Sequence, residues 1–221
     1  EFEETNLFST NRFPGFDDVE AGLRANIGGK YIMYDPNGWE FTTTAGRVFR
    51  QKDLNQFDAS KSTGLDKLNS DYVSAFSLKS PQNLKVLTRL LLDDSMDASK
   101  HETKLGYSSK KYSADLGYVW LDKQSVLNLD NHQHEVNIST NYMVNNNWKL
   151  GADWRQNIDT HSPISGNFAI MFENDCAKMN FSLDLQYDEQ DRIDRTFGMQ
   201  IFLSGLGSNS NKKKFNNRCG G

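Results

Sequence analysis

The chain has 221 residues and a net charge of −4 from 25 basic and 29 acidic side chains, which gives no electrostatic case for nucleic-acid binding. An aromatic content of 12% with only four prolines argues against a disordered chain. The most apolar run, residues 86–92, is interrupted by Thr88 and Arg89. A transmembrane helix is therefore excluded, but a membrane β-barrel is not.

Apolar and polar residues alternate with period two along most of the chain, which is the pattern of β-strands. In the clearest segment, residues 148–155, Trp148 and Leu150 fall on one face while Lys149 and Asp153 fall on the other. The pattern predicts about eleven strands, at 19–33, 39–50, 71–79, 84–93, 102–109, 111–121, 134–144, 148–159, 165–173, 177–187 and 196–205.

Short and long connections alternate between these strands. Tight turns are predicted at 35–38, 80–83, 108–110, 145–147 and 173–175, and longer polar loops at 51–70, 94–101, 122–133, 160–164 and 188–195. Transmembrane barrels have short periplasmic turns and longer outer loops. Many of the predicted strands also have the length of about 9–11 residues that spans a bilayer at a tilt, whereas soluble strands average about five or six.

Aromatic residues lie at both ends of the predicted strands, as interfacial belts of a membrane barrel do. One belt flanks the tight turns and the other lies beside the longer loops; together they contain Tyr31, Trp39, Trp120, Tyr142, Trp148, Phe172 and Tyr187. A soluble β-sandwich or barrel, whose strands also alternate, is the alternative. It gives no reason for the regular alternation of connection lengths.

The predicted fold is an all-β, antiparallel up-and-down meander of about eleven strands that forms the C-terminal portion of a large transmembrane β-barrel. If the tight turns are periplasmic, the first strand begins outside the cell and the last ends in the periplasm. Since a complete bacterial barrel has an even strand number, we expect further strands upstream of Glu1. The expected organisation is an extracellular loop segment at 1–18, a partial barrel at 19–206 and a polar periplasmic tail at 207–221.

Four stretches of the sequence, in this order along the chain, resemble one protein family. They are LFSTNRFPGFDDVEAGLRAN at 7–26, STGLD at 62–66 with SDYV at 70–73, FENDC at 172–176, and QIFLSGLG at 200–207. The family is LptD, the outer-membrane lipopolysaccharide assembly proteins, also called organic solvent tolerance proteins. Pro14 and Asp18 depart from its pattern, in which serine and a basic residue are common at those places.

The resemblance implies a non-enzymatic transport component that inserts lipopolysaccharide into the outer leaflet of a Gram-negative outer membrane, without a cofactor. It implies as partners lipopolysaccharide, membrane lipid, an LptE-like plug lipoprotein, and periplasmic lipopolysaccharide bridge proteins, which bind through an N-terminal domain that has no counterpart here. A porin-like channel or an outer-membrane barrel hydrolase is the alternative function. A soluble β-sheet binding protein is the third.

The resemblance also implies roles for particular residues. Cys176, in a predicted turn, would form a disulfide with the absent N-terminal domain, and pairing with Cys219 is the rival. The last strand would form the lateral gate, with Thr196, Phe197, Gly198, Met199, Gln200, Ile201, Phe202 and Leu203. The inward faces of the strands carry lumen-facing candidates, for which general solvation of the lumen is the simpler reading: Arg24, Lys30, Lys149, Asp153, Arg155, Asp184 and Gln186.

The four histidines, at 101, 132, 134 and 161, fall in or beside the predicted outer loops. His132 and His134 could form a metal pair, but no third ligand is close in sequence, so no metal site is predicted. A hydrolase would need catalytic groups that converge near one rim. No nucleophile elbow or phosphate loop is present, so scattered loop histidines and no catalytic residue are expected.

Overall fold

The computed structural model describes residues 2–9, 21–53, 64–122, 132–188 and 192–203. Within these residues no helix is long and apolar enough to cross a membrane. The eleven strands are β1 Arg24–Tyr34, β2 Glu40–Arg50, β3 Tyr72–Lys79, β4 Leu84–Leu92, β5 Ala98–Ser108, β6 Tyr112–Leu121, β7 Gln133–Met143, β8 Trp148–Asn157, β9 Pro163–Glu173, β10 Ala177–Tyr187 and β11 Ile193–Leu203.

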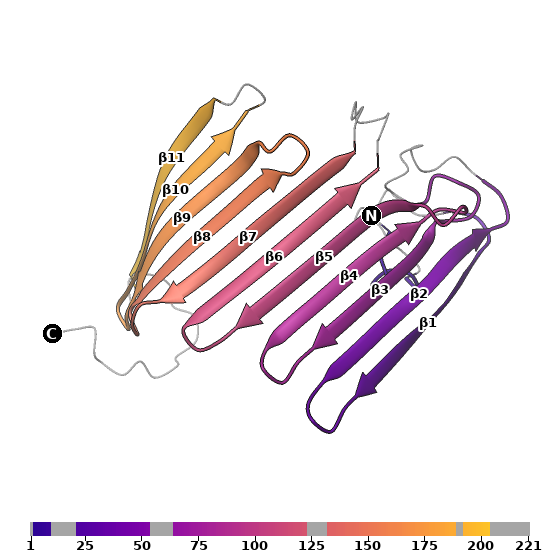
Figure 1. The fold of residues 1–221 in the computed structure, drawn as a ribbon, viewed down its shortest axis with the longest axis horizontal. Helices are drawn as coiled ribbons and strands as arrows, with labels where there is room; N and C mark the ends of the chain where they lie inside the picture. Colours follow the sequence, from indigo (N-terminus) through magenta and orange to yellow (C-terminus); the bar gives the residue numbers. More distant parts are fainter. Residues whose placement is uncertain (1, 10–20, 54–63, 123–131, 189–191, 204–221) are drawn as a thin grey trace, which may run out of the picture. The chain divides into compact units, whose positions relative to one another are not determined.

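The strand order runs from β1 to β11 in sequence order, as expected for an up-and-down meander (Figure 1). Each described pairing is antiparallel, as in the register of Arg24 with Arg50 and Tyr34 with Glu40. The predicted all-β antiparallel meander is therefore confirmed, and it is consistent with part of a β-barrel. Residues 10–20 and 204–221 lie outside the described residues, so the domain boundaries at 18 and 206 remain predictions.

Three of the predicted longer loops are wrong in their bounds by two residues or more. Between β8, which ends at Asn157, and β9, which begins at Pro163, the connection covers 158–162 and not 160–164. β5 begins at Ala98 and β11 at Ile193, so the loops predicted at 94–101 and 188–195 are shorter. Asp93 closes the first of them, because its Oδ1 accepts the backbone N–H of Ser95 at 2.8 Å and of Asp97 at 3.0 Å. A side-chain acceptor of this kind stabilises a tight turn where composition alone indicates a polar loop.

The tight turns are built by the same chemistry. The Oδ2 atom of Asp35 accepts the N–H of Asn37 at 2.8 Å, and Asn145 Oδ1 accepts the N–H of Trp148 at 2.9 Å. Gly38 completes the first turn with a φ of +90°, which glycine adopts without strain. These short-range bonds fix where each hairpin reverses and therefore which residues share a face.

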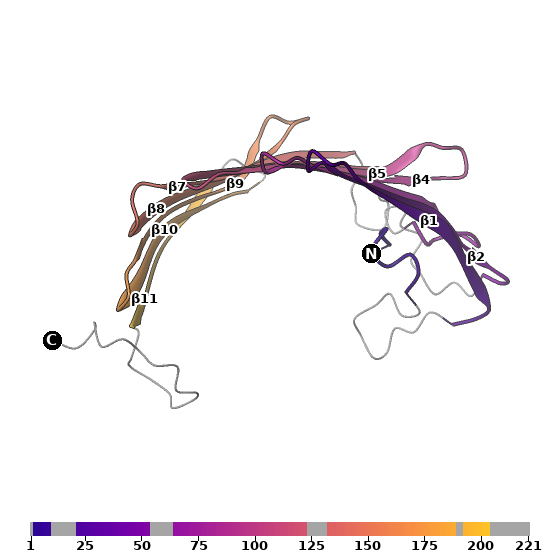
Figure 2. The ribbon, with the colours of Figure 1, turned by 90° about the horizontal axis from the view of Figure 1, so that it is seen from below.

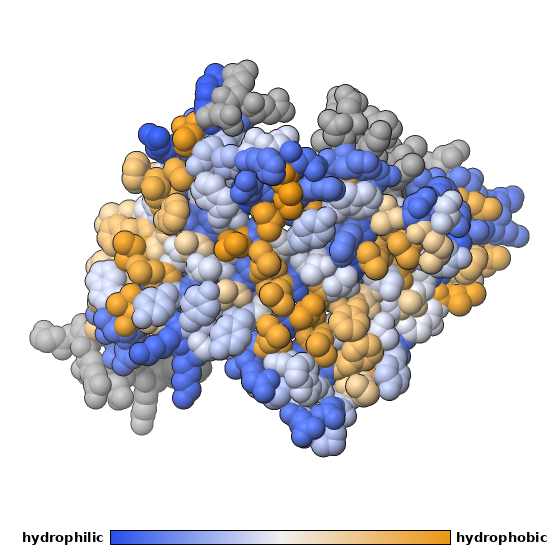
Figure 3. All heavy atoms as spheres, viewed as in Figure 1, coloured by the Kyte–Doolittle hydropathy of each residue, from blue (hydrophilic) through white to orange (hydrophobic). Residues whose placement is uncertain are grey.

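The chain divides into two compact units. Unit 1 contains residues 1–107, 116–136 and 157–160, and unit 2 contains residues 108–115, 137–156 and 161–221. On the face drawn in Figure 3, hydrophobic side chains lie over the strand middles and hydrophilic side chains gather at the strand ends.

Each unit has one face rich in large apolar side chains, which we call its apolar face, and an opposite polar face. The register places on the apolar face of unit 1 Ile27, Tyr31, Met33, Phe41, Phe76, Val86, Leu90 and Leu105. It places on that of unit 2 Leu150, Phe168, Ile170, Phe181, Leu183, Phe197, Met199 and Ile201. The predicted two-faced strands are thus present in both units.

Candidate functional site

The N-terminal segment of residues 2–9 lies against the polar face of unit 1, beside β1 to β5 (Figure 2). Phe2 and Leu7 are almost completely buried, at 1% and 0% exposure. They belong to an apolar cluster that also contains Val48, Leu65, Val73 and Leu91. An apolar cluster on an otherwise polar face was not predicted from the sequence.

Two glycines make room for Leu7. Gly28 of β1 and Gly46 of β2 are opposite each other in the register. A Cβ atom built on Gly28 would lie 2.7 Å from Leu7 Cδ2 and 2.6 Å from the carbonyl oxygen of Ala45. Because both residues lack a side chain, Leu7 packs directly on the backbone of β1 and β2. This close approach explains glycine in the interior of these strands.

Arg89 fastens the same segment electrostatically. Its Nε lies 2.9 Å from Glu4 Oε1, its Nη2 lies 3.8 Å from Glu3 Oε2, and its Nη1 lies 3.4 Å from Glu102 Oε2 on the neighbouring strand. Lys104 adds a contact of 2.6 Å to Glu102. One guanidinium thus serves three carboxylates, and the cluster orders both the segment and the β4–β5 pair.

Replacing Arg89 with alanine is expected to destabilise the docked segment by about 1–2 kcal/mol, because the change leaves three clustered carboxylates without their shared cation. Limited proteolysis of the purified full-length protein measures the effect as faster cleavage within residues 2–9. Lys104→Ala removes a cation from the exposed edge of the same cluster and should leave the cleavage rate unchanged. Equal rates in wild type and Arg89→Ala would contradict the ionic attachment.

Residues 64–71 are joined to β2 and β5 by a second polar network. Ser70 Oγ accepts the N–H of Val48 at 2.9 Å, and the Ser70 carbonyl accepts Arg47 Nε at 2.6 Å. Ser99 Oγ donates to Asp71 Oδ2 at 2.7 Å. Burial raises the pKa of the Asp71 carboxyl, and the bond from Ser99 opposes this only in part.

A raised carboxyl pKa in the folded state favours the protonated form, so this group's stabilising contribution is present at low pH and is lost as pH rises through its folded pKa. Asp71→Asn keeps an acceptor for Ser99 without the buried charge. We expect its urea midpoint to exceed that of wild type at neutral pH, and the difference to vanish below about pH 4. An Asp71→Asn midpoint below that of wild type at neutral pH would contradict the burial argument. Ser77→Asn, on the polar face of β3 away from Asp71, is the control and should leave the midpoint unchanged at both pH values.

The family-like motifs noted in the sequence meet in this region. Leu7 comes from the first motif, Leu65 from the second, and Ser70, Asp71 and Val73 from the SDYV stretch; all are buried. One feature of the sequence is consistent with this packing, because β4 has leucines on both of its faces. Leu91, on its polar face, is the one that enters the apolar cluster.

The lumen-facing candidates all fall on polar faces. In unit 1, Arg24 and Lys30 share the face of Gly28. In unit 2 the register places the others on one polar face: Lys149, Asp153, Arg155, Asp184 and Gln186. Asn167, between Asp153 and Asp184 in the register, donates its Nδ2 to Asp184 Oδ1. That these faces line a lumen remains a prediction.

The predicted gate residues all lie in β11, the last strand of the order. Their side chains alternate: Phe197, Met199, Ile201 and Leu203 lie on the apolar face, and Thr196, Gly198, Gln200 and Phe202 lie on the polar face. Phe197 is 79% exposed and Met199 is 61% exposed. No described strand pairs with the outer edge of β11.

Cys176 lies in the tight turn between β9 and β10, where its N–H donates to Asn174 Oδ1 at 2.9 Å. No cysteine among the described residues is free. Cys219 lies outside the described residues, so the disulfide partner of Cys176 remains a prediction.

Three of the histidines lie together in unit 1, so the expectation of scattered loop histidines is wrong for them. Trp120 stacks on His132 with ring centroids 5.5 Å apart, and Tyr118 contacts His101 at the same distance. Carboxylates pair with two of the rings: Asp122 with His132 at 3.0 Å and Asp159 with His134 at 2.9 Å. The described residues contain no group of three or more His, Cys, Asp or Glu placed to hold a metal ion.

Comparison with known proteins tests the resemblance. The family described as "LptD: LPS transport system D" matches residues 1–148, about two thirds of the 221-residue chain. No curated protein matches the chain. The match includes the N-terminal segment, the two glycines beneath Leu7 and the network around Asp71, and it confirms the resemblance to the family. The stretches at 7–26 and 62–73 lie within the matched residues, whereas those at 172–176 and 200–207 lie outside them. The chain belongs to the LptD family, whose function is lipopolysaccharide transport.

Proposed function

We propose that the chain is part of an outer-membrane β-barrel that inserts lipopolysaccharide into the outer leaflet of a Gram-negative bacterium through a lateral gate at β11. The observation that supports this proposal most directly is the exposed apolar row of β11 in a chain of the lipopolysaccharide transport family. In water such a row is a liability, but in lipid it is the expected surface of a strand. The alternating faces give each strand one side for lipid and one for an aqueous lumen.

The gate follows from the cost of strand edges. An unpaired edge in lipid leaves backbone groups without partners, so the outer edge of β11 requires another strand. A seam between two strands that opens transiently provides a path from the lumen into the membrane. The polar faces, with Lys149, Arg155 and Gln186, suit the phosphorylated saccharide headgroup and a plug lipoprotein like LptE.

The remaining assignments belong to the same proposal. The tight turns lie on the periplasmic side, and Cys176 in one of them bonds to an N-terminal domain that receives lipopolysaccharide from periplasmic bridge proteins. Mass mapping of the full-length protein under non-reducing conditions tests this tether. A peptide that joins Cys176 to a cysteine upstream of Glu1 supports it, and a bond from Cys176 to Cys219 would contradict it.

The gate is tested by site-specific photocrosslinking in living cells. A photoreactive residue replaces Gln200 on the polar face of β11, and the same residue replaces Lys149 on the polar face of β8 as the control. Lipopolysaccharide adducts should be more abundant at Gln200, because every molecule that leaves passes the seam. Equal adducts at both positions, or none at Gln200, would refute the gate. A purified protein that conducts small solutes but yields no adducts would favour the porin-like alternative.

A further inference from the structure

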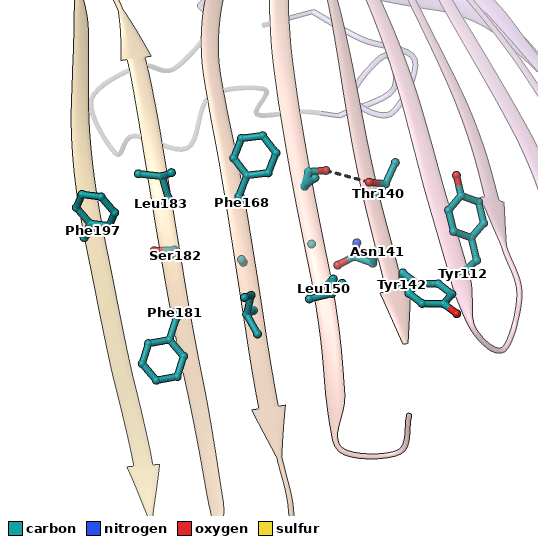
Figure 4. A pocket seen from close by; sticks show the side chains of 14 residues that line it. Tyr112, Thr140, Asn141, Tyr142, Leu150, Phe168, Phe181, Ser182, Leu183 and Phe197 are labelled. Carbon is teal, nitrogen blue, oxygen red and sulfur yellow. Dashed lines mark hydrogen bonds between the residues drawn. The ribbon is translucent and has the colours of Figure 1, made fainter. Parts of the chain in front are cut away.

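A hollow of about 520 Å³ lies on the apolar face of unit 2 between two rows of side chains (Figure 4). The rows follow the register across β8 to β11, with Phe168, Leu183 and Phe197 in one row and Leu150, Ile170 and Phe181 in the other. Gly151 and Ala169 lie between the rows and form part of the floor. This groove has the size of a small-molecule site, for which about 300–1,000 Å³ is usual.

The chemistry of the groove is that of a hydrocarbon chain. None of its described lining residues is charged. Thr140, one of the few polar ones, donates its hydroxyl to the carbonyl of Ala152 at 3.4 Å. A polar ligand would therefore lose its hydrogen bonds with water on entering and would regain few of them.

The groove runs obliquely across the strands, from the strand ends near the tight turns to the middle of β11. At one end it begins beside Tyr112, the first residue of β6, and Tyr142, the next-to-last residue of β7, close to the tight turns. At the other end it reaches Phe197, which precedes the last residue of β11 by six positions. With a rise of about 3.3 Å per residue and a strand tilt of about 35–45°, these six positions place Phe197 at a depth of roughly 14–16 Å from the turn end of the strand. This depth is close to half of the ~30 Å hydrocarbon core.

Positive charge lies at the shallow end. Lys110 and Lys111 are exposed in the turn that leads into Tyr112. The Lys111 carbonyl accepts the N–H of Met143 at 2.7 Å, which holds this turn beside the end of β7. Lysines at a membrane surface attract anionic headgroups, and aromatic rings favour the same depth.

We propose that the groove binds one acyl chain of an anionic phospholipid from the leaflet on the tight-turn side, with the lipid phosphate at Lys110 and Lys111. The headgroup charge matches the two lysines, and the groove spans the depth of one leaflet. A bound chain covers Phe197 and so supports β11 at the edge of the strand order. The inference rests on the proposed function, because it requires the apolar face to lie in lipid.

The test uses the full-length protein in nanodiscs of phosphatidylcholine that contain a little phosphatidylglycerol with a photoreactive acyl chain. Labelled peptides are identified by mass spectrometry. Label should concentrate on residues 150–152 and 168–170, above the level on β2 to β4. Ala152→Leu, which fills the groove, should reduce label there to that level. Ala45→Leu, the same change on the apolar face of β2, should leave it unchanged.

The headgroup contact is tested by the double variant Lys110→Gln and Lys111→Gln, which should weaken labelling by phosphatidylglycerol roughly tenfold to thirtyfold. Label spread evenly over the apolar faces of both units would mean ordinary surrounding lipid and would overturn the inference. Displacement of the label by added lipopolysaccharide would also overturn it. Absence of label on every strand would instead refute membrane insertion, and with it the proposed function.

Discussion

Replacing Gly28 with valine is expected to destabilise the protein by about 2–3 kcal/mol, whereas Gly29→Val is expected to be close to neutral. A side chain at Gly28 would meet Leu7, the carbonyl oxygen of Ala45 and, at 2.9 Å, the Cα atom of Gly46. The backbone contacts cannot yield without parting β1 from β2. A Cβ atom at Gly29 has no neighbour within 4 Å.

The two variants differ by one position in one strand, so strand propensity changes alike in both. The measurement is the urea concentration at which the full-length protein loses its heat-modifiable band on gels. Cleavage within residues 2–9 by an added protease should also rise in Gly28→Val alone. If both variants unfold at the same midpoint, the packing of Leu7 on the glycine pair is wrong.

Met199→Lys is expected to destabilise the membrane-inserted protein by about 2–4 kcal/mol, the cost of a lysine on the lipid face near the bilayer middle. Met199 lies mid-strand on the apolar face of β11 and is 61% exposed. In a soluble sheet an exposed methionine tolerates lysine to within about 0.5 kcal/mol. The substitution therefore separates a membrane strand from a soluble one.

Gln200→Lys is the matched control, because the adjacent side chain lies on the polar face. Both variants are compared by urea unfolding of the full-length protein in lipid vesicles, followed by tryptophan fluorescence. Only Met199→Lys should shift the midpoint downward. A neutral Met199→Lys would contradict the assignment of this face to lipid.

The strands could be predicted from the sequence because period-two alternation is a local signal that each strand carries alone. Trp148 to Arg155 separates apolar from polar residues without reference to any other segment. The face of Lys149, Asp153 and Asp184 follows from the same alternation. The predicted start of β5 was wrong because a side chain forms the turn before it. Asp93 accepts two backbone N–H groups there, and composition alone does not indicate these hydrogen bonds.

The contacts that depend on tertiary packing could not be predicted. Phe2 and Leu7 are buried only because residues 2–9 pack on the polar face of unit 1, and no local sequence pattern indicates this packing. The histidine group forms because β5, β6 and β7 lie side by side, which brings His101, His132 and His134 together from distant positions. Leu91 was the visible hint, because a leucine on a polar face requires a partner.

Depletion of the full-length protein in the cells that produce it is the most direct test of the proposed transport of lipopolysaccharide to the cell surface. Newly made lipopolysaccharide at the surface is then measured with an impermeant probe. Surface lipopolysaccharide should fall as the protein is lost and should recover when wild type is supplied, but not when the Met199→Lys variant is supplied. Unchanged surface lipopolysaccharide after depletion would contradict the proposed transport.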